Sequence, residues 1–287
     1  MSEREGSRRE RGATEGRAPN RHFGEQGGKL SYGSYLHVPQ LLDQQVPVAE
    51  PPAHDELLFI VIHQVYELWF KQLIHELEHA QELLESGHTA RVQHTLRRVL
   101  TILKVAVGQV DVLETMTPRQ FTGFRNRLDA ASGFQSAQFR QLEAILGRRD
   151  PAILAATPEG SATRTALLAT MSRPSLYDSF LRYLALHGYA APAALLQRDV
   201  SQPLGRTPKL DDVLLAVYVA DEGPAQVCER MVDLDEGLQE WRYRHVKMVE
   251  RTIGDKAGTG GSSGAGYLRS TLTPPMFPDL WAIRSRL

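Results

Sequence analysis

Cysteine is almost absent from this chain, because Cys228 is the only one among its 287 residues. A single cysteine excludes an intramolecular disulfide and a metal site built from several thiolates. An excess of charge is missing too: the formal net charge is −1, which gives no general attraction to nucleic acid or to an anionic membrane. The single cysteine favours a reducing compartment. We therefore expect a cytoplasmic protein with neither nucleic acid nor a membrane among its partners.

Long apolar runs are also missing. No stretch approaches the roughly 20 apolar residues that a membrane-spanning helix needs, and the N-terminus lacks the apolar centre of a secretion signal. No stretch alternates apolar and polar residues convincingly with the period of two that is typical of strands. Hydrophobic residues make up 42% of the chain and charged residues 23%, which is the composition of a soluble globular protein.

Two regions differ in composition. Residues 1–28 are polar and rich in Arg, Glu and Gly, so we predict a disordered N-terminal tail. In residues 29–287 apolar side chains recur every three or four positions, which predicts a single all-α domain, a bundle of several long helices with additional short helices packed against them. The helices are expected over about residues 54–79, 89–115, 118–128, 134–146, 174–188, 211–219 and 224–254.

The segment 54–79 organises the rest of the chain. Its most apolar part contains one titratable side chain, His63, which on a helical wheel shares a flank with Phe59, Phe70 and Ile74. A buried histidine needs a hydrogen-bond partner. It is therefore either a core residue bonded to a carbonyl group or a polar group directed into an apolar ligand pocket.

Three further features each have two interpretations. His245 shares an apolar helix face with Trp241, and it is either a core residue or the axial ligand of a haem iron. Arg125, beside a glycine and two phenylalanines, is a surface charge or a clamp for a substrate carboxylate. The glycine-rich loop 258–266 is a flexible linker or a mobile lid in which the hydroxyl of Thr259 meets a polar ligand.

The sequence His75-Glu-Leu-Glu-His79 matches the H-E-x-x-H pattern of zinc peptidases. On the helical wheel both histidines fall on the polar face, and a catalytic zinc needs a third protein ligand and a walled cleft. We interpret the match as a coincidence. A zinc peptidase remains an alternative, and so does a plain helical interaction protein in which every histidine is structural.

Six separated motifs, in order and from about Leu30 to the C-terminus, resemble tryptophan 2,3-dioxygenase. They read Tyr32-Gly-Ser-Tyr-Leu, His54-Asp-Glu-Leu-Leu-Phe-Ile-Val-Ile-His-Gln-Val-Tyr-Glu-Leu-Trp, Gly123-Phe-Arg, Ser132-Gly-Phe-Gln-Ser, Trp241-Arg-Tyr-Arg-His and Gly258-Thr-Gly-Gly-Ser-Ser-Gly-Ala-Gly. Six motifs in register are far more specific than any one of them.

The resemblance implies an all-helical homotetramer with a haem b (ferrous iron) pocket between helices. It implies that L-tryptophan and O₂ are converted to N-formyl-L-kynurenine, the first step of tryptophan breakdown by the kynurenine route. By position, His245 corresponds to the proximal iron ligand and His63 to the distal histidine that hydrogen-bonds the indole N–H. A haem-binding sensor module without turnover is the alternative, since it would need His245 but not the substrate contacts.

The resemblance also implies a set of substrate-binding residues. Arg125 would clamp the carboxylate, and Thr259 would meet the amino-acid head group as the glycine loop closes. Other positions would contact the substrate from the pocket wall or from a neighbouring subunit: Phe59, Ile60, Val61, Ile62 and Phe121 in the wall, and Tyr32 and Tyr35 from the neighbour. At Phe121 many relatives have tyrosine, so Arg125 and Thr259 would carry more of the carboxylate binding here.

Overall fold

The computed structural model describes residues 30–129, 131–258 and 265–287, and within them every regular element is helical. The all-α prediction is thereby confirmed. The chain forms two compact units that divide between Val46 and Pro47. In the first unit α1 (Tyr32–Tyr35) and α2 (Val38–Leu42) bury no side chain. The predicted disordered tail, residues 1–28, lies outside the described residues.

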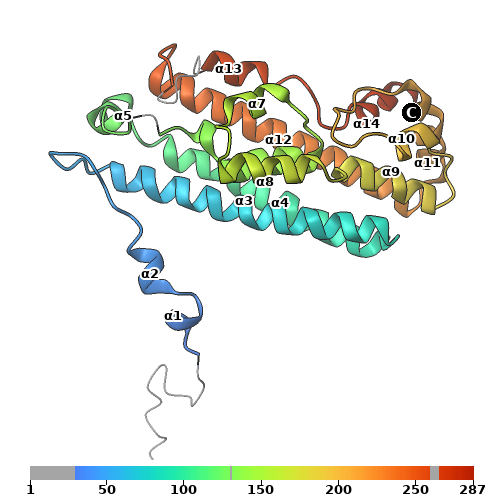
Figure 1. Cartoon of the computed structure of the whole chain (residues 1–287), viewed down its shortest axis with the longest axis horizontal. Helices are drawn as coiled ribbons and strands as arrows, with labels where there is room; N and C mark the ends of the chain where they lie inside the picture. Colours follow the sequence, from blue (N-terminus) through green and yellow to red (C-terminus); the bar gives the residue numbers. More distant parts are fainter. Residues whose placement is uncertain (1–29, 130, 259–264) are drawn as a thin grey trace, which may run out of the picture. The chain divides into compact units, whose positions relative to one another are not determined.

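Three long helices dominate the second unit: α3 (Glu56–Glu85), α4 (Thr89–Leu113) and α12 (Gly223–Ile253). They run alongside one another in Figure 1, and α4 packs against both α3 and α12. The shorter helices are α5 (Pro118–Arg125), α6 (Ala137–Leu146), α7 (Pro151–Ala156), α8 (Ala162–Met171), α9 (Leu176–Leu186), α10 (Ala193–Leu196), α11 (Asp211–Ala220), α13 (Ala265–Ser270) and α14 (Pro278–Ala282), with 3₁₀ turns at Gly133–Gln135, Pro208–Leu210 and Ile283–Arg286.

Local sequence signals set the ends of these helices. At α5 the side chains of Thr117 and Gln120 satisfy each other's backbone N–H groups in a capping box, and Pro118 occupies the first helical turn. Between α3 and α4 the chain reverses within three residues, where Gly87 adopts a φ of 70° that favours glycine. The short reversal makes α3 and α4 an antiparallel pair.

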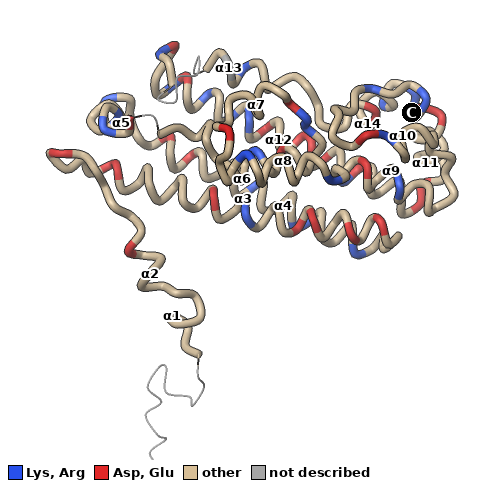
Figure 2. The backbone as a smooth tube through the Cα atoms, viewed as in Figure 1, with Lys and Arg blue, Asp and Glu red and all other residues tan. Residues whose placement is uncertain are grey.

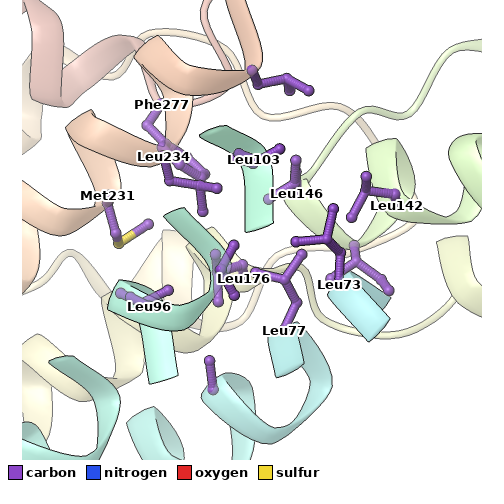
Figure 3. Packing of buried hydrophobic residues seen from close by; sticks show 14 of the residues in the cluster. Leu73, Leu77, Leu96, Leu103, Leu142, Leu146, Leu176, Met231, Leu234 and Phe277 are labelled. Carbon is purple, nitrogen blue, oxygen red and sulfur yellow. The ribbon is translucent and has the colours of Figure 1, made fainter. Parts of the chain in front are cut away.

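The core of the second unit is a continuous cluster of apolar side chains between the helices. Figure 3 shows part of it, with residues from α3, α4, α6, α9 and α12 and from the segment before α14: Leu73, Leu77, Leu96, Leu103, Leu142, Leu146, Leu176, Met231, Leu234 and Phe277. Burying one such side chain contributes about 1.5–3 kcal/mol. This cluster therefore fixes how the long helices lie against one another.

By length and composition alone, α3 could cross a membrane, provided that its most apolar stretch of 18 residues is allowed up to two charged side chains. The sequence contains no uninterrupted apolar run of that length. In the structure α3 packs against α4, α6 and α9 and buries Leu73, Leu77 and Leu84 completely or nearly so. Its apolar character is therefore that of a core helix of the bundle. Figure 2 shows basic and acidic residues interspersed along the helices.

Candidate functional site

A cavity lies between α3, α4, α5, α6 and α12, and Gly258, Leu268 and Thr271 also line it. The cavity measures about 250 Å³ and is partly open to solvent. Its lining is mainly apolar and aromatic with a few charged side chains, which is typical of a small-molecule or cofactor site.

His63 lines this cavity from α3, and its ring is oriented by the backbone. The Nδ1 atom lies 2.7 Å from the carbonyl oxygen of Phe59. A carbonyl oxygen only accepts, so Nδ1 carries the proton and Nε2 is left as an acceptor. Burial lowers the pKa of His63 below 6.5, against a smaller opposing effect of the Phe59 carbonyl. The neutral ring thus presents a hydrogen-bond acceptor.

Aromatic rings surround this acceptor. The ring of Phe59 lies 4.1 Å from that of His63, 5.7 Å from that of Phe121 and 5.5 Å from that of Phe124, centroid to centroid. Phe124 is fully buried, while Phe59 and Phe121 face the cavity. Such a wall favours a flat apolar ligand and excludes water around it.

His245 reaches the same cavity from α12. The ring of Trp241, one turn earlier, stacks on it with centroids 5.2 Å apart and planes 9° from parallel. Burial has the largest effect on the pKa of His245, and the nearby His63 and Arg140 have smaller effects in the same direction. Together they lower this pKa to about 4. The imidazole is therefore neutral at physiological pH, which is the form that binds a metal.

Arg125 ends α5 at the edge of the cavity. One terminal nitrogen, Nη2, donates to the carbonyl oxygen of Ala257 at 2.5 Å. The Nε atom is buried and has no hydrogen-bond partner among the described residues. A buried unpaired donor is costly. This N–H is therefore available to an anionic ligand such as a carboxylate.

The structure brings together His63, Phe59, Phe121, Arg125 and His245, all of which line the cavity. Three other predicted residues do not line it, because consecutive positions of a helix cannot all face one side: Ile60, Val61 and Ile62. Ile62 is buried in the core, and Val61 is 38% exposed at the surface.

The remaining predicted residues lie elsewhere. Tyr32 and Tyr35 belong to the first unit, where they are 79% and 68% exposed. Thr259 lies outside the described residues. Of the two other members of the flank predicted for α3, Phe70 lines the cavity, and Ile74 packs against the core.

Several cavity residues were not predicted from the sequence. Tyr66 lies between His63 and Phe70 on the same flank of α3, so helical spacing could have found it. A buried charged group also lines the cavity, and its members come from α6 and α12: Arg140, Glu143 and Arg242. Arg242 falls within the motif Trp241-Arg-Tyr-Arg-His, but its meeting with Arg140 and Glu143 arises only through the tertiary fold.

A buried residue of the H-E-x-x-H match makes other contacts. Glu76 is buried and accepts hydrogen bonds from Arg98 at 2.9 Å and Gln72 at 2.7 Å, while His75 is exposed. Within the part of the chain that the structure describes, no three His, Cys, Asp or Glu side chains group as a metal site would require. These contacts weigh against the zinc peptidase.

Comparisons with known proteins agree with one another. A family model described as tryptophan 2,3-dioxygenase matches residues 15–157 and 210–287. A tryptophan 2,3-dioxygenase of Anaeromyxobacter sp. (strain K) is 62% identical over 263 residues, which cover 90% of this chain and 96% of that protein. Similar enzymes of Herpetosiphon aurantiacus and Serratia proteamaculans are 57% and 40% identical, each over 90% of this chain and over 98% and 94% of their own lengths.

Proposed function

The chain belongs to the tryptophan 2,3-dioxygenase family, and on this premise we propose that its cavity holds haem b beside L-tryptophan, with His245 as the iron ligand. The enzyme cleaves the 2,3-bond of the indole ring with O₂ and yields N-formyl-L-kynurenine, the first step of the kynurenine route. One observation carries the assignment: two neutral histidines from α3 and α12 share a cavity with an arginine whose Nε–H has no partner among the described residues.

The residues present fit a haem. His245 is a single neutral imidazole in an aromatic slot, as an iron ligand requires, and the aromatic side chains that line the cavity suit a flat apolar macrocycle. When bound, haem supplies the iron that binds and activates O₂, which by itself reacts slowly with a closed-shell indole. Both oxygen atoms enter the product, so turnover consumes no external reductant.

The residues of the chain bind and orient the substrate. Nε2 of His63 accepts the indole N–H, since Nδ1 is occupied by the Phe59 carbonyl. Phe59 and Phe121 pack on the ring and keep water away, and Arg125 binds the carboxylate through Nε–H. From the resemblance, Thr259, which lies outside the described residues, would contact the amino-acid head group. Holding the indole in one orientation raises the rate by removing the entropy cost of alignment.

A spectrum and a product assay test this assignment. Haem-replete protein is expected to show a Soret band that changes when tryptophan is added without air, and admission of O₂ should then yield N-formylkynurenine. Absence of the Soret band would contradict the haem assignment. Haem binding without product would favour the sensor module, which needs His245 alone.

The pKa of His63 predicts how activity depends on pH. Protonation of Nε2 removes the acceptor for the indole N–H, and burial lowers the pKa of this ring below 6.5. We therefore expect kcat/KM to be fully developed above pH 6.5 and to fall in acid, with a midpoint below 6.5. Measurement of kcat/KM from about pH 5 to about pH 8 checks this. A midpoint above 6.5, or an unchanged acid limb in His63→Ala, would contradict the role of His63.

We further propose that the protein is a cytoplasmic homotetramer. Exposed apolar side chains recur at helical spacing on both helices: Leu57, Val61 and Leu68 on α3, and Val105 and Val112 on α4. Hydrogen bonds from Tyr66 to Ala106 and from Gln109 to Ile62 place these residues at matching levels of α3 and α4, and we infer that the five form one stripe. An apolar stripe favours contact with another protein surface. Tyr32 and Tyr35, also exposed, would enter a neighbour's cavity.

A charge within this stripe should break the assembly. Leu68 is 51% exposed, so Leu68→Glu leaves the folded subunit intact but places a carboxylate in the subunit contact, where it would lose its hydration. We expect light scattering coupled to size exclusion to show a smaller species. Val219→Glu is the matched control, because Val219 is 77% exposed on α11 and lies outside the stripe. An unchanged mass for Leu68→Glu would exclude the stripe as a subunit contact.

A further inference from the structure

One buried carboxylate at the cavity gathers three guanidinium groups. Glu143 on α6 is 2% exposed. Its oxygens accept hydrogen bonds from Arg140 at 2.6 Å, from Arg148 at 3.0 Å and from Arg242 at 2.8 Å. Arg242 on α12 is itself only 5% exposed. Buried charges are tolerated only when the partners remain in place, so this network restricts how α6 and α12 can move relative to each other.

Arg242 joins three segments that are far apart in the sequence. Its Nη2 atom donates to Glu143, and its Nη1 atom donates to the carbonyl oxygen of Thr271 at 3.2 Å. Glu143 lies on α6, Arg242 on α12 and Thr271 just beyond α13. The planar guanidinium fixes both directions at once, which a lysine ammonium cannot do in the same way.

The turn of α12 that carries Arg242 directly precedes His245. Residues three and four apart lie on the same side of a helix, so both Trp241 and Arg242 flank His245. Trp241 packs on Phe139 of α6, with ring centroids 4.8 Å apart. This turn of α12 is thus held to α6 by a ring contact and by an ion pair. A rotation of α12 about its axis would break both and would turn His245 away from its present direction.

We propose that Arg242, anchored by Glu143, is a positioning residue that fixes the direction in which α12 presents His245 to the haem iron. The proposal rests on the proposed function, because it takes His245 as the ligand. Arg242 acts through the helix and through Trp241, and no hydrogen bond joins it to His245 among the interactions of the described residues. Its loss should therefore weaken the axial bond without removing it.

The test compares two arginine substitutions in haem-loaded protein. Arg242→Met keeps the length of the side chain and removes the guanidinium, while Glu143 retains Arg140 and Arg148. Arg98→Met is the matched control, because it removes a guanidinium from a different buried glutamate, Glu76, which does not line the cavity. We expect Arg242→Met to accelerate haem transfer to an apoglobin acceptor by about tenfold or more, as for residues that orient metal ligands, and Arg98→Met to stay within about twofold.

A second readout separates positioning from general destabilisation. The iron–histidine stretch of the ferrous protein should shift or broaden in Arg242→Met and remain unchanged in Arg98→Met, even if both variants unfold at lower temperature. Arg242→Lys, which retains the charge, should recover part of the difference. If Arg242→Met does not fold, Arg242→Lys is compared with Arg98→Lys in the same two measurements.

The outcomes separate this inference from the proposed function. The wild-type protein could have histidine-ligated haem while both variants lose haem at the same rate and show the same iron–histidine stretch. That result would overturn the role of Arg242 alone. Wild-type protein without histidine-ligated haem would overturn the assignment of His245 and the positioning role with it. Faster haem loss and an altered stretch confined to the Arg242 variants would support the inference.

Discussion

Replacing His245 with alanine is expected to abolish stable haem binding and with it all dioxygenase activity. His245 is the histidine that α12 contributes to the cavity, and burial keeps its imidazole neutral and ready to bind iron. Without it α12 would offer the iron no ligand. The haem content of purified protein, measured from the Soret band against protein concentration, gives the result directly.

Two companion variants sharpen this experiment. His245→Gly leaves a hole the size of an imidazole, so added imidazole should restore ligation and part of the haem content. His75→Ala removes an exposed histidine of the H-E-x-x-H match and should change neither haem content nor activity. If His245→Ala retained haem with the wild-type spectrum, another residue would have to be the ligand.

Replacing Arg125 with alanine is expected to raise the KM for tryptophan strongly. The buried Nε–H of Arg125 has no partner among the described residues, so a substrate carboxylate would gain a charged hydrogen bond there. Loss of such a bond costs about 2 kcal/mol or more, which corresponds to roughly 30-fold in KM. Phe121 lacks the hydroxyl of tyrosine and cannot donate a hydrogen bond to the carboxylate. Steady-state kinetics with saturating O₂ provide the measurement.

A substrate without a carboxylate isolates the contact. Tryptamine has the indole ring and the amine of tryptophan but no carboxylate, so Arg125→Ala should bind it as well as the wild type does. Arg127→Ala is the matched control, since Arg127 is exposed and donates to the carbonyl oxygen of Glu50 instead. An unchanged KM for tryptophan in Arg125→Ala would remove this residue from the clamp.

Helical periodicity predicted most of the fold because the core is built from apolar stripes. The main difference lies at the end of α3, which continues past His79 to Glu85. The stripe itself continues through Ala80, Leu83 and Leu84, all buried, until the chain reverses at Gly87. The polar residues around His79 hid this continuation, since they occupy the solvent side of the same turns.

The site was predictable in part. For His63 the sequence left a choice between a core histidine bonded to a carbonyl and a pocket residue. The structure shows both at once, because Nδ1 bonds Phe59 and the ring lines the cavity. The pairing of Glu143 with Arg242 was not predictable, since 99 residues separate its members and nothing in either local sequence indicates the other.

The order of the chain bears on how the enzyme acquires its cofactor. α3 and α4 are neighbours in sequence and can pair as soon as both are made, but α12, which carries His245, follows much later in the chain. If His245 holds the haem iron as proposed, a nascent chain has the wall that carries His63 well before it has the iron ligand. Haem would then enter only after α12 has folded onto this pair, and a chain shortened before α12 would keep the α3–α4 pair yet lack the ligand.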